Sequence, residues 1–171
     1  KVDAEMIIEE NGEESFNGFI GIEIRGASSQ LFPKKSFGLE TRDEENEDLD
    51  ISLLGYPEEE DWILYAPYSD KSLLRNVLIY DLSRDIDRYA SRTRFVDLVI
   101  NDRYQGVYVF MEKLKRDDGR IDINNLKEDE NSGEDVTGGY ILKIDKTAGS
   151  NLGEGYNDQN SFSSAYAPQN A

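Results

Sequence analysis

Apolar and polar residues alternate over several short stretches of the chain, with the two-residue period of a β-strand that buries one face. The clearest stretch is 17–25, where Ile22 and Ile24 alternate with Glu23 and Arg25. Patterns of this kind predict strands at residues 4–9, 17–25, 35–41, 62–65, 95–100, 104–111 and 139–145. Most of the chain to residue 146 therefore reads as strand and connecting loop.

Polar turn residues join four of these strands in pairs. Asn11 and Gly12 stand between the first two strands, and Asn101, Asp102 and Arg103 stand between the fifth and sixth. Such residues favour the tight turns of antiparallel hairpins. The sheet is therefore expected to be mostly antiparallel.

One segment, 71–89, shows the period of a helix instead. Apolar residues recur there at every fourth position, at Leu74, Leu78, Leu82 and Ile86, and the stripe is widened by Leu73, Val77 and Tyr89. Asp70 precedes the segment and is an expected N-cap, because its carboxylate can accept hydrogen bonds from the first turn. The order of elements predicts an α+β fold, a mostly antiparallel sheet with one long helix.

The chain is strongly acidic, with 36 Asp and Glu against 19 Lys and Arg and a net charge of −17. This charge repels phosphate backbones and anionic lipid, so we expect no nucleic-acid partner and no membrane insertion. Acidic runs at 43–50 and 58–61 are expected to be solvated loops. The first run lacks the glycine and terminal glutamate of an EF-hand loop, and no metal site is predicted.

Cysteine and histidine are both absent. Their absence excludes disulfides, a thiol nucleophile and a Ser-His-Asp triad. Acid or base chemistry would have to use carboxylates, Lys or Tyr. Residues 147–171 are rich in Gly, Asn, Ser and Gln, so we expect a folded region at 1–146 followed by a polar loop or tail.

The most informative block lies around a Gly/Ser loop that begins at Gly26. Backbone N–H groups and hydroxyls on such a loop are suitable donors to phosphate oxygens, and flanking cations can neutralise the phosphate charge. The candidate contacts are Arg25, Ser28, Ser29, Lys34 and Lys35. The alternative is an ordinary hairpin with two solvated lysines, one of them paired with Glu40.

Two further blocks carry candidate residues. Arg75 and Asn76 lie near the start of the predicted helix, where a polar side chain can reach a cleft; alternatively, Arg75 pairs with nearby acids. The strand 104–111 continues into Glu112, and Gly106 on that strand permits a close approach by another group. The alternative for this third block is a plain core strand.

Taken together, these segments resemble the CotH (spore coat protein H) family of atypical kinases. The resemblance covers about residues 17–146 and points to the N-terminal half of the kinase domain. It rests on four motifs in the family's order: IRGASSQLFPKKSFGLE (24–40), WILYAPYSDKSLLRNVLIYDL (62–82), YQGVYVFMEKL (104–114) and GGYILKID (138–145).

The resemblance implies the small lobe of a protein-kinase-like fold and ATP-dependent phosphoryl transfer to Ser or Thr of secreted or surface proteins. The expected cofactor is ATP with Mg²⁺, and the expected location is extracellular or on the cell or spore surface. Arg25, Ser28, Ser29 and Lys34 or Lys35 would contact the phosphates. The strand ending at Glu112 would lie beside adenine.

Two departures from the kinase pattern accompany the resemblance. The predicted helix has no glutamate to pair with a strand lysine, so either the partner comes from elsewhere or Arg75 replaces the pairing. The catalytic and Mg²⁺-binding aspartates of the family lie in a later segment near a Trp-Asp-Phe-Asp type motif, and the only tryptophan here is Trp62. We therefore expect the chain alone to be catalytically incomplete. The alternative is a noncatalytic extracellular assembly module.

Overall fold

The computed structural model describes residues 1–124, 126–127, 129–137, 140–144 and 162–164. The chain divides into two compact units. The first contains residues 1–115 and 119–121, and the second contains residues 116–118 and 122–171. The two units are described separately below.

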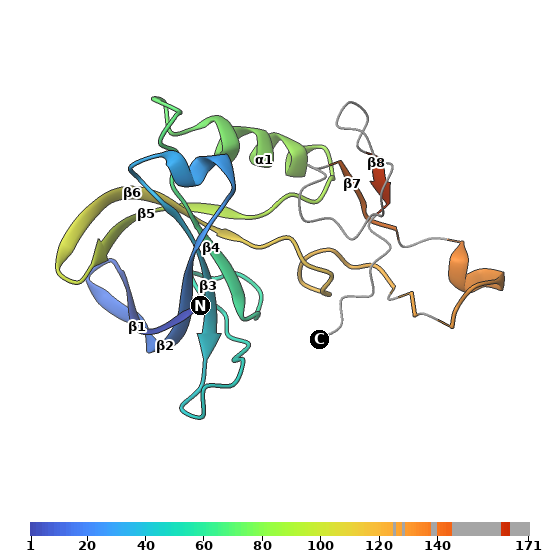
Figure 1. Ribbon diagram of the computed structural model, residues 1–171, viewed down its shortest axis with the longest axis horizontal. Coiled ribbons are helices and arrows are strands. Elements are labelled where there is room, and N and C mark those ends of the chain that lie inside the picture. Colours follow the sequence, from blue (N-terminus) through green and yellow to red (C-terminus); the bar gives the residue numbers. More distant parts are fainter. Residues whose placement is uncertain (125, 128, 138–139, 145–161, 165–171) are drawn as a thin grey trace. The chain divides into compact units, whose positions relative to one another are not determined.

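The first unit is a six-stranded sheet with the strand order β1-β2-β3-β4-β6-β5, in which every neighbouring pair is antiparallel (Figure 1). Its elements are β1 (Val2–Glu10), β2 (Glu13–Arg25), the 3-10 turn η1 (Ser28–Leu31), β3 (Ser36–Arg42), β4 (Asp61–Tyr65), α1 (Arg75–Asp85), β5 (Thr93–Ile100) and β6 (Arg103–Glu112). The six strands expected in this region are therefore present.

Both predicted hairpins form around turns with positive φ angles. Asn11 and Gly12 have φ angles of 56° and 84°, and Asn101 and Asp102 have φ angles of 49° and 60°. Two consecutive left-handed residues are typical of the two-residue turns that match the twist of antiparallel strands. The turn residues thus explain why β1 pairs with β2 and β5 with β6.

The sheet curls so that its two edge strands contribute to one core. Arg94 on β5 forms a 2.6 Å ion pair with Glu10 at the end of β1. The core lies on the concave face and is built around the stacked rings of Tyr56, Trp62 and Phe110. Packed against it are Ala4, Met6 and Ile8 from β1 and Val96 and Leu98 from β5. The result is a half-barrel with an inner, apolar face and an outer face.

The prediction of one long helix over 71–89 is wrong, because α1 spans only Arg75–Asp85. Leu73 has a φ of 61°, which a right-handed helix cannot contain, so the helix begins after it. At the other end Asp87 has a φ of 56° and stops the helix. The fold is accordingly a mostly antiparallel half-barrel with one short helix, and not an α+β fold with a long one.

The four central residues of the predicted apolar stripe are not the buried face of the helix, although Val77 at the edge of the stripe is part of it. Val77 and Tyr80 of α1 pack on the outer face of the sheet, against Tyr65, Ile63, Val109 and Met111. The stripe residues Leu74, Leu78, Leu82 and Ile86 are 51%, 57%, 50% and 69% exposed.

Within the described ranges, no helix has the length and apolar character needed to cross a membrane.

The second unit contains the 3-10 turn η2 (Gly133–Val136) and the antiparallel strands β7 (Leu142–Ile144) and β8 (Phe162–Ser164). β7 falls within the strand expected at 139–145. The boundary expected at residue 146 and most of the expected tail, 147–171, lie outside the described residues.

Candidate anion-binding face

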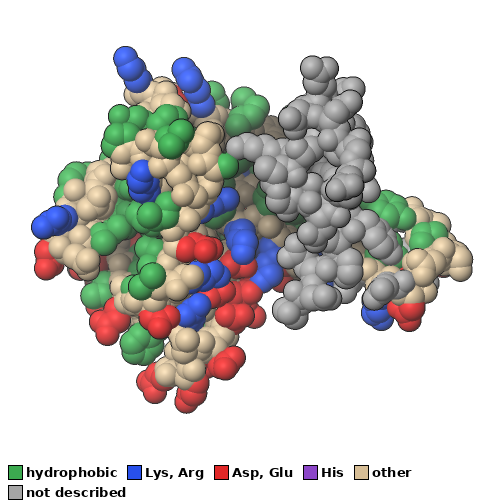
Figure 2. Space-filling view, in the orientation of Figure 1, with side chains coloured by type: hydrophobic (Ala, Val, Ile, Leu, Met, Phe, Trp, Pro, Cys, Tyr) green, Lys and Arg blue, Asp and Glu red, His purple; other side chains and the backbone are tan. Residues whose placement is uncertain are grey.

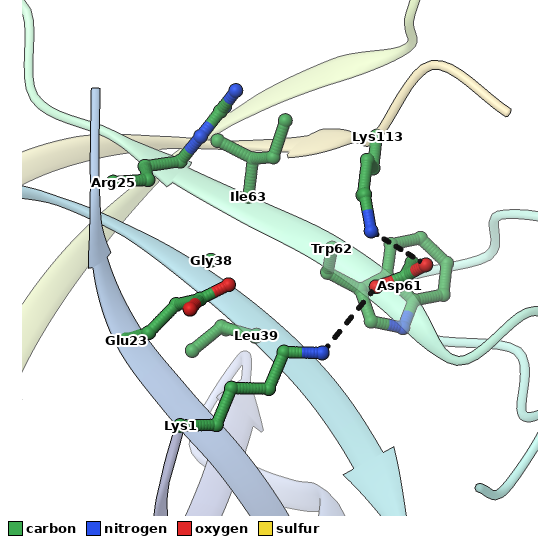
Figure 3. Close-up of a pocket in the computed structure, with 9 residues that line it drawn as sticks. All are labelled: Lys1, Glu23, Arg25, Gly38, Leu39, Asp61, Trp62, Ile63 and Lys113. Atoms are coloured by element: carbon green, nitrogen blue, oxygen red, sulfur yellow. Dashed lines mark hydrogen bonds and ion pairs between the residues drawn. The ribbon is translucent and has the colours of Figure 1, made fainter. Parts of the chain in front are cut away.

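The candidate site lies on the outer face of the half-barrel, beside α1. The strand register places Glu23, Gly38, Ile63 and Met111 in one row across β2, β3, β4 and β6. Ile63 and Met111 also support Val77 and Tyr80 of α1, so the helix occupies the same face. A cavity of about 60 Å³ opens along this row (Figure 3). Its lining comprises Lys1, Glu23, Arg25, Gly38, Leu39, Asp61, Trp62, Ile63 and Lys113.

Two of the three cations in this cavity already pair with carboxylates of the protein. Lys113 Nζ lies 2.8 Å from Asp61 Oδ2, and Lys1 Nζ lies 3.9 Å from Asp61 Oδ1. Figure 3 shows the two lysines approaching Asp61 from different sides. Lys1 also pairs with Glu40. The charges of Lys1 and Lys113 are therefore largely satisfied within the protein.

Arg25 is the third cation, and it forms no hydrogen bond or ion pair with any residue in the described part of the chain. It ends β2, and Figure 3 shows its side chain extending beside Ile63. Burial lowers the pKa of Arg25, while the nearby Tyr80 and Glu23 act in the opposite direction. Arg25 is nevertheless exposed overall, and an exposed guanidinium without a protein partner is available to bind an anion.

The loop after Arg25 is closed by its own residues. Gly26 has a φ of 107°, and a Cβ atom added there would lie 2.0 Å from Ser29 Oγ, so this position requires glycine. Gln30 Nε2 donates a 2.6 Å hydrogen bond back to the Gly26 carbonyl oxygen. Ser28 and Ser29 both lie in η1, where Ser28 is exposed and Ser29 is half-buried. The predicted Gly/Ser loop is thus a preformed turn.

Lys34 and Lys35 do not line the cavity that contains Arg25. Lys34 Nζ donates a 2.5 Å hydrogen bond to the Val107 carbonyl oxygen and lies 4.4 Å from the centre of the Tyr108 ring. Lys35 Nζ donates to the carbonyl oxygens of Gln30 and Phe32, at 2.6 and 2.7 Å. The structure therefore does not gather Arg25, Lys34 and Lys35 into one cradle. Both lysines support the loop.

The alternative pairing of one lysine with Glu40 is also not observed. Glu40 binds Lys1 and Arg42, whose combined hydrogen bonds and charges lower the pKa of Glu40 against the opposing effect of burial. Arg42 extends to Asp3 on β1, at 2.7 Å. Figure 2 shows the result as basic and acidic side chains intermixed over the middle of the surface in that view.

Arg75, the first residue of α1, does not reach the cavity. Its side chain is 78% exposed, and Nε lies 3.6 Å from Asp70 Oδ1. The Asp70 carboxylate accepts hydrogen bonds from the backbone N–H groups of Ser72 and Arg75, at 3.0 and 2.9 Å. Together with the Ser72 hydroxyl, these bonds lower the pKa of Asp70. The arrangement matches the pairing with a nearby acid that sequence analysis left open.

Glu112 is 0% exposed and lies on the inner side, opposite Trp62 in the register of β4 and β6. Its carboxylate accepts hydrogen bonds from the backbone N–H of Arg92 at 2.7 Å and from Arg92 Nη1 at 2.6 Å. The side chain is thus occupied by a structural pair. The next residue, Lys113, lines the cavity instead, and the alternation of side chains along a strand is the signal that could have identified it.

The acidic run 58–61 is not a solvated loop as expected. Glu59 is 2% exposed, and Asp61 begins β4. Carboxylate oxygens of Asp50, Glu59 and Glu60 lie within 4.8 Å of one another. Lys115 and Arg120 bind these acids, at 2.6 Å each from Glu59, so we assign no metal there. Burial and a hydrogen bond with Glu60 raise the pKa of Glu59 to about 7.

Comparison with known proteins agrees with the motifs along the sheet. No curated protein matches the chain. The model of one protein family, described as CotH kinase protein, matches residues 22–171, from within β2 to the end of the sequence. The matched region includes the Gly/Ser loop, α1 and all of the cavity-lining residues except Lys1. The chain therefore belongs to the CotH kinase protein family.

Proposed function

We propose that the outer face of the half-barrel is one wall of a nucleotide site, with Arg25 as the contact to the phosphate groups. The observation that carries this proposal is the unpaired Arg25 guanidinium at the end of a cavity where Lys1 and Lys113 already pair with Asp61. An anion that entered this cavity would gain a charge-assisted, two-pronged contact without displacing an existing ion pair.

The shape of the cavity indicates that this wall alone does not enclose a nucleotide. Its volume is about 60 Å³, whereas pockets for small molecules and cofactors occupy roughly 300–1,000 Å³. Gly38 keeps the floor flat, because it has no side chain to fill the space between Glu23 and Ile63. A second wall is needed to bury the ligand. We therefore expect weak binding by this chain and tighter binding when the rest of a kinase domain is present.

The chemistry of phosphoryl transfer suits such a site. Catalysis of this reaction depends mainly on holding the triphosphate and neutralising its charge, and it requires neither histidine nor cysteine. In this proposal Arg25 holds phosphate oxygens, whereas Ser28 and Ser29 do not line the cavity. Bound ATP with Mg²⁺ would supply the transferable phosphoryl group. Its acceptor would be Ser or Thr of an extracellular or surface protein, and the catalytic aspartate would come from another segment.

A noncatalytic assembly module is the second candidate, and the two lysines favour it. The ammonium groups of Lys34 and Lys35 donate hydrogen bonds to backbone carbonyl oxygens. These bonds stabilise the loop and leave fewer cations to bind a triphosphate. Under this alternative the half-barrel serves only as a binding surface for other proteins.

Isothermal titration of the chain with Mg²⁺-ATP distinguishes the two candidates. We expect measurable binding that weakens roughly tenfold or more in Arg25→Ala, with little change in the melting temperature without ligand. Arg103→Ala is the matched control, since Arg103 is exposed at the distant β5–β6 turn. Equal heats for the wild type, Arg25→Ala and Arg103→Ala would exclude the nucleotide site and leave the assembly module.

A further inference from the structure

The segment that follows β6 is fastened to the start of β4 by buried ion pairs. Residues 119–121 belong to the same compact unit as the sheet, whereas residues 116–118 belong to the second unit. The chain therefore leaves the sheet unit and re-enters it within a few residues. The contacts of residues 119–121 show that Arg120 is the residue that holds them against the sheet.

Arg120 makes the central contacts of this return. Its side chain is 1% exposed, and Nη1 lies 2.6 Å from Glu59 Oε2. The same Nη1 donates a 2.9 Å hydrogen bond to the carbonyl oxygen of Lys113. The guanidinium also lies over Trp62, with Cζ 4.9 Å from the ring centre. One side chain thus joins the returning residues to β4 and to the end of β6.

Neighbouring contacts reinforce the return without replacing Arg120. Ile121 donates its backbone N–H to the Lys115 carbonyl oxygen at 3.3 Å. Arg92 Nη1 donates to the Gly119 carbonyl oxygen at 3.1 Å. Lys115 Nζ lies 2.6 Å from Glu59 Oε1 and also binds Glu60. Apart from the stacking on Trp62, these contacts are polar, so the closure depends on a few directional bonds instead of a large apolar area.

The burial of Arg120 is only partly compensated by protein acceptors. Among the described residues, Nε and Nη2 of Arg120 have no hydrogen-bond partner, although both atoms are buried. Burying a charge with incomplete hydrogen bonding costs free energy that the ion pair with Glu59 must offset. The closed arrangement therefore depends strongly on the contact between Arg120 and Glu59, and its loss should release the returning residues together.

We propose that Arg120 is a latch that closes the segment after β6 onto β4 and thereby positions Lys113 at the edge of the cavity. The closure follows from the contacts of Arg120 alone. The consequence for ligand binding rests on the proposed function. Lys113 lines the cavity, and Arg120 binds the carbonyl oxygen of this same residue. Arg120 itself does not line the cavity, so it acts as a positioning residue.

Amide hydrogen exchange by NMR tests the latch on the full chain. The reporters are the Ile121 amide, which bonds to Lys115, and the Val109 amide at the buried centre of β6. In Arg120→Met, which keeps an apolar side chain against Trp62, we expect the protection factor at Ile121 to fall roughly tenfold or more while Val109 keeps its protection. Arg120→Lys should restore part of the protection, since lysine can still pair with Glu59. Arg94→Met, which removes the ion pair between β5 and β1, should leave Ile121 unchanged.

Unchanged exchange at Ile121 in Arg120→Met would overturn the latch. Equal losses at Ile121 and Val109 would also overturn it, because Arg120 would then be an ordinary part of the global core. Should Arg120→Met not fold, Glu59→Gln supplies the test, since it removes the charge of the group that Arg120 contacts and keeps the shape of the side chain. A selective loss at Ile121 supports the latch, and no selective loss refutes it.

Titration with Mg²⁺-ATP tests the second half of the proposal separately. We expect Arg120→Met to weaken binding several-fold and Arg120→Lys to recover part of it. If Arg25→Ala leaves binding unchanged, the proposed function fails, whereas the exchange result at Ile121 still decides the latch. If Arg25→Ala weakens binding and Arg120→Met does not, Arg120 closes the segment without positioning the site.

Discussion

Lys34 donates a hydrogen bond from Nζ to the carbonyl oxygen of Val107 at 2.5 Å, across 73 residues of sequence. The same ammonium lies 4.4 Å from the centre of the Tyr108 ring, and burial lowers its pKa. Gly106 makes room for it, since a Cβ atom there would lie 3.3 Å from Nζ. The Gly/Ser loop is therefore tied directly to β6, and two motifs that resemble the same family meet at one contact.

Replacing this lysine should destabilise the fold. Lys34→Met keeps the length of the side chain but removes the hydrogen bond to Val107 and the interaction with Tyr108. We expect the free energy of unfolding to fall by about 1–3 kcal/mol, measured by urea denaturation. Lys71→Met is the control, because Lys71 is exposed on the loop before α1 and should change stability by less than about 0.5 kcal/mol. Equal effects of the two substitutions would show that the contact of Lys34 contributes nothing.

The turn at Gly26 permits a test of sterics against backbone strain. Gly26 and Gly12 both have positive φ angles, but a Cβ atom at Gly12 would meet nothing within 4 Å, whereas one at Gly26 would collide with Ser29 Oγ. We expect Gly12→Ala to cost about 1 kcal/mol, from backbone strain alone, and Gly26→Ala to cost clearly more.

Removing the colliding hydroxyl separates the two contributions at Gly26. In a Ser29→Ala background, Gly26→Ala should cost only about as much as Gly12→Ala, because the remaining Ser29 Cβ would lie 3.4 Å away. Denaturation of the wild type, Gly26→Ala, Ser29→Ala and the double variant completes the double-mutant cycle. If Ser29→Ala gives no relief, the loop adjusts to the collision and does not hold Ser29 in place.

The strands were predictable because each carries its own local signal. Ile22 and Ile24 alternate with Glu23 and Arg25 in β2, and turn residues such as Asn11 and Gly12 mark where the chain reverses. These signals act between residues close in sequence. The six strands of the sheet and both hairpins therefore follow from short segments read one at a time.

The directions of the charged side chains were not predictable, because distant residues decide them. Nothing near Lys34 indicates that its ammonium reaches Val107, and nothing near Glu59 indicates that Arg120 will bury it. The sequence placed Arg25, Lys34 and Lys35 together because they flank one loop. In the structure, both lysines donate to backbone carbonyl oxygens, and Arg25 is the one of these three residues that lines the cavity.

The orientation of α1 illustrates a related limit and yields a test. Helical spacing centres the apolar side on the row that contains Leu78, but the sheet binds the side with Tyr80 and with Val77, which lies at the edge of that row. We expect Val77→Ala to lower the free energy of unfolding by about 1–2 kcal/mol, and Leu78→Ala, at a position 57% exposed, by less than about 0.5 kcal/mol. Urea denaturation of the two variants provides the comparison. The reverse order, with the leucine costing more, would mean that the apolar stripe is the buried face.

Glu59 makes stability depend on pH near neutrality. Its pKa in the folded protein is raised to about 7, mainly by burial, whereas an unfolded glutamate has a pKa of about 4.3. The folded state therefore binds the proton more tightly. The stabilisation from protonated Glu59 is complete below the unfolded pKa and is lost as the pH rises through about 7. On this basis the free energy of unfolding should fall between pH 5 and pH 8, by on the order of 2 kcal/mol.

The variant Glu59→Gln isolates this effect, because glutamine can still accept hydrogen bonds from Lys115 and Arg120 but carries no titratable proton. The difference in unfolding free energy between wild type and Glu59→Gln should change steadily from pH 5 to pH 8, in favour of the wild type at the acid end. Glu10→Gln, at an exposed ion pair with Arg94, should give a difference that stays flat over the same range. A flat difference for Glu59→Gln would mean that Lys115 and Arg120 hold its carboxylate fully ionised, and that their attraction outweighs the cost of burial.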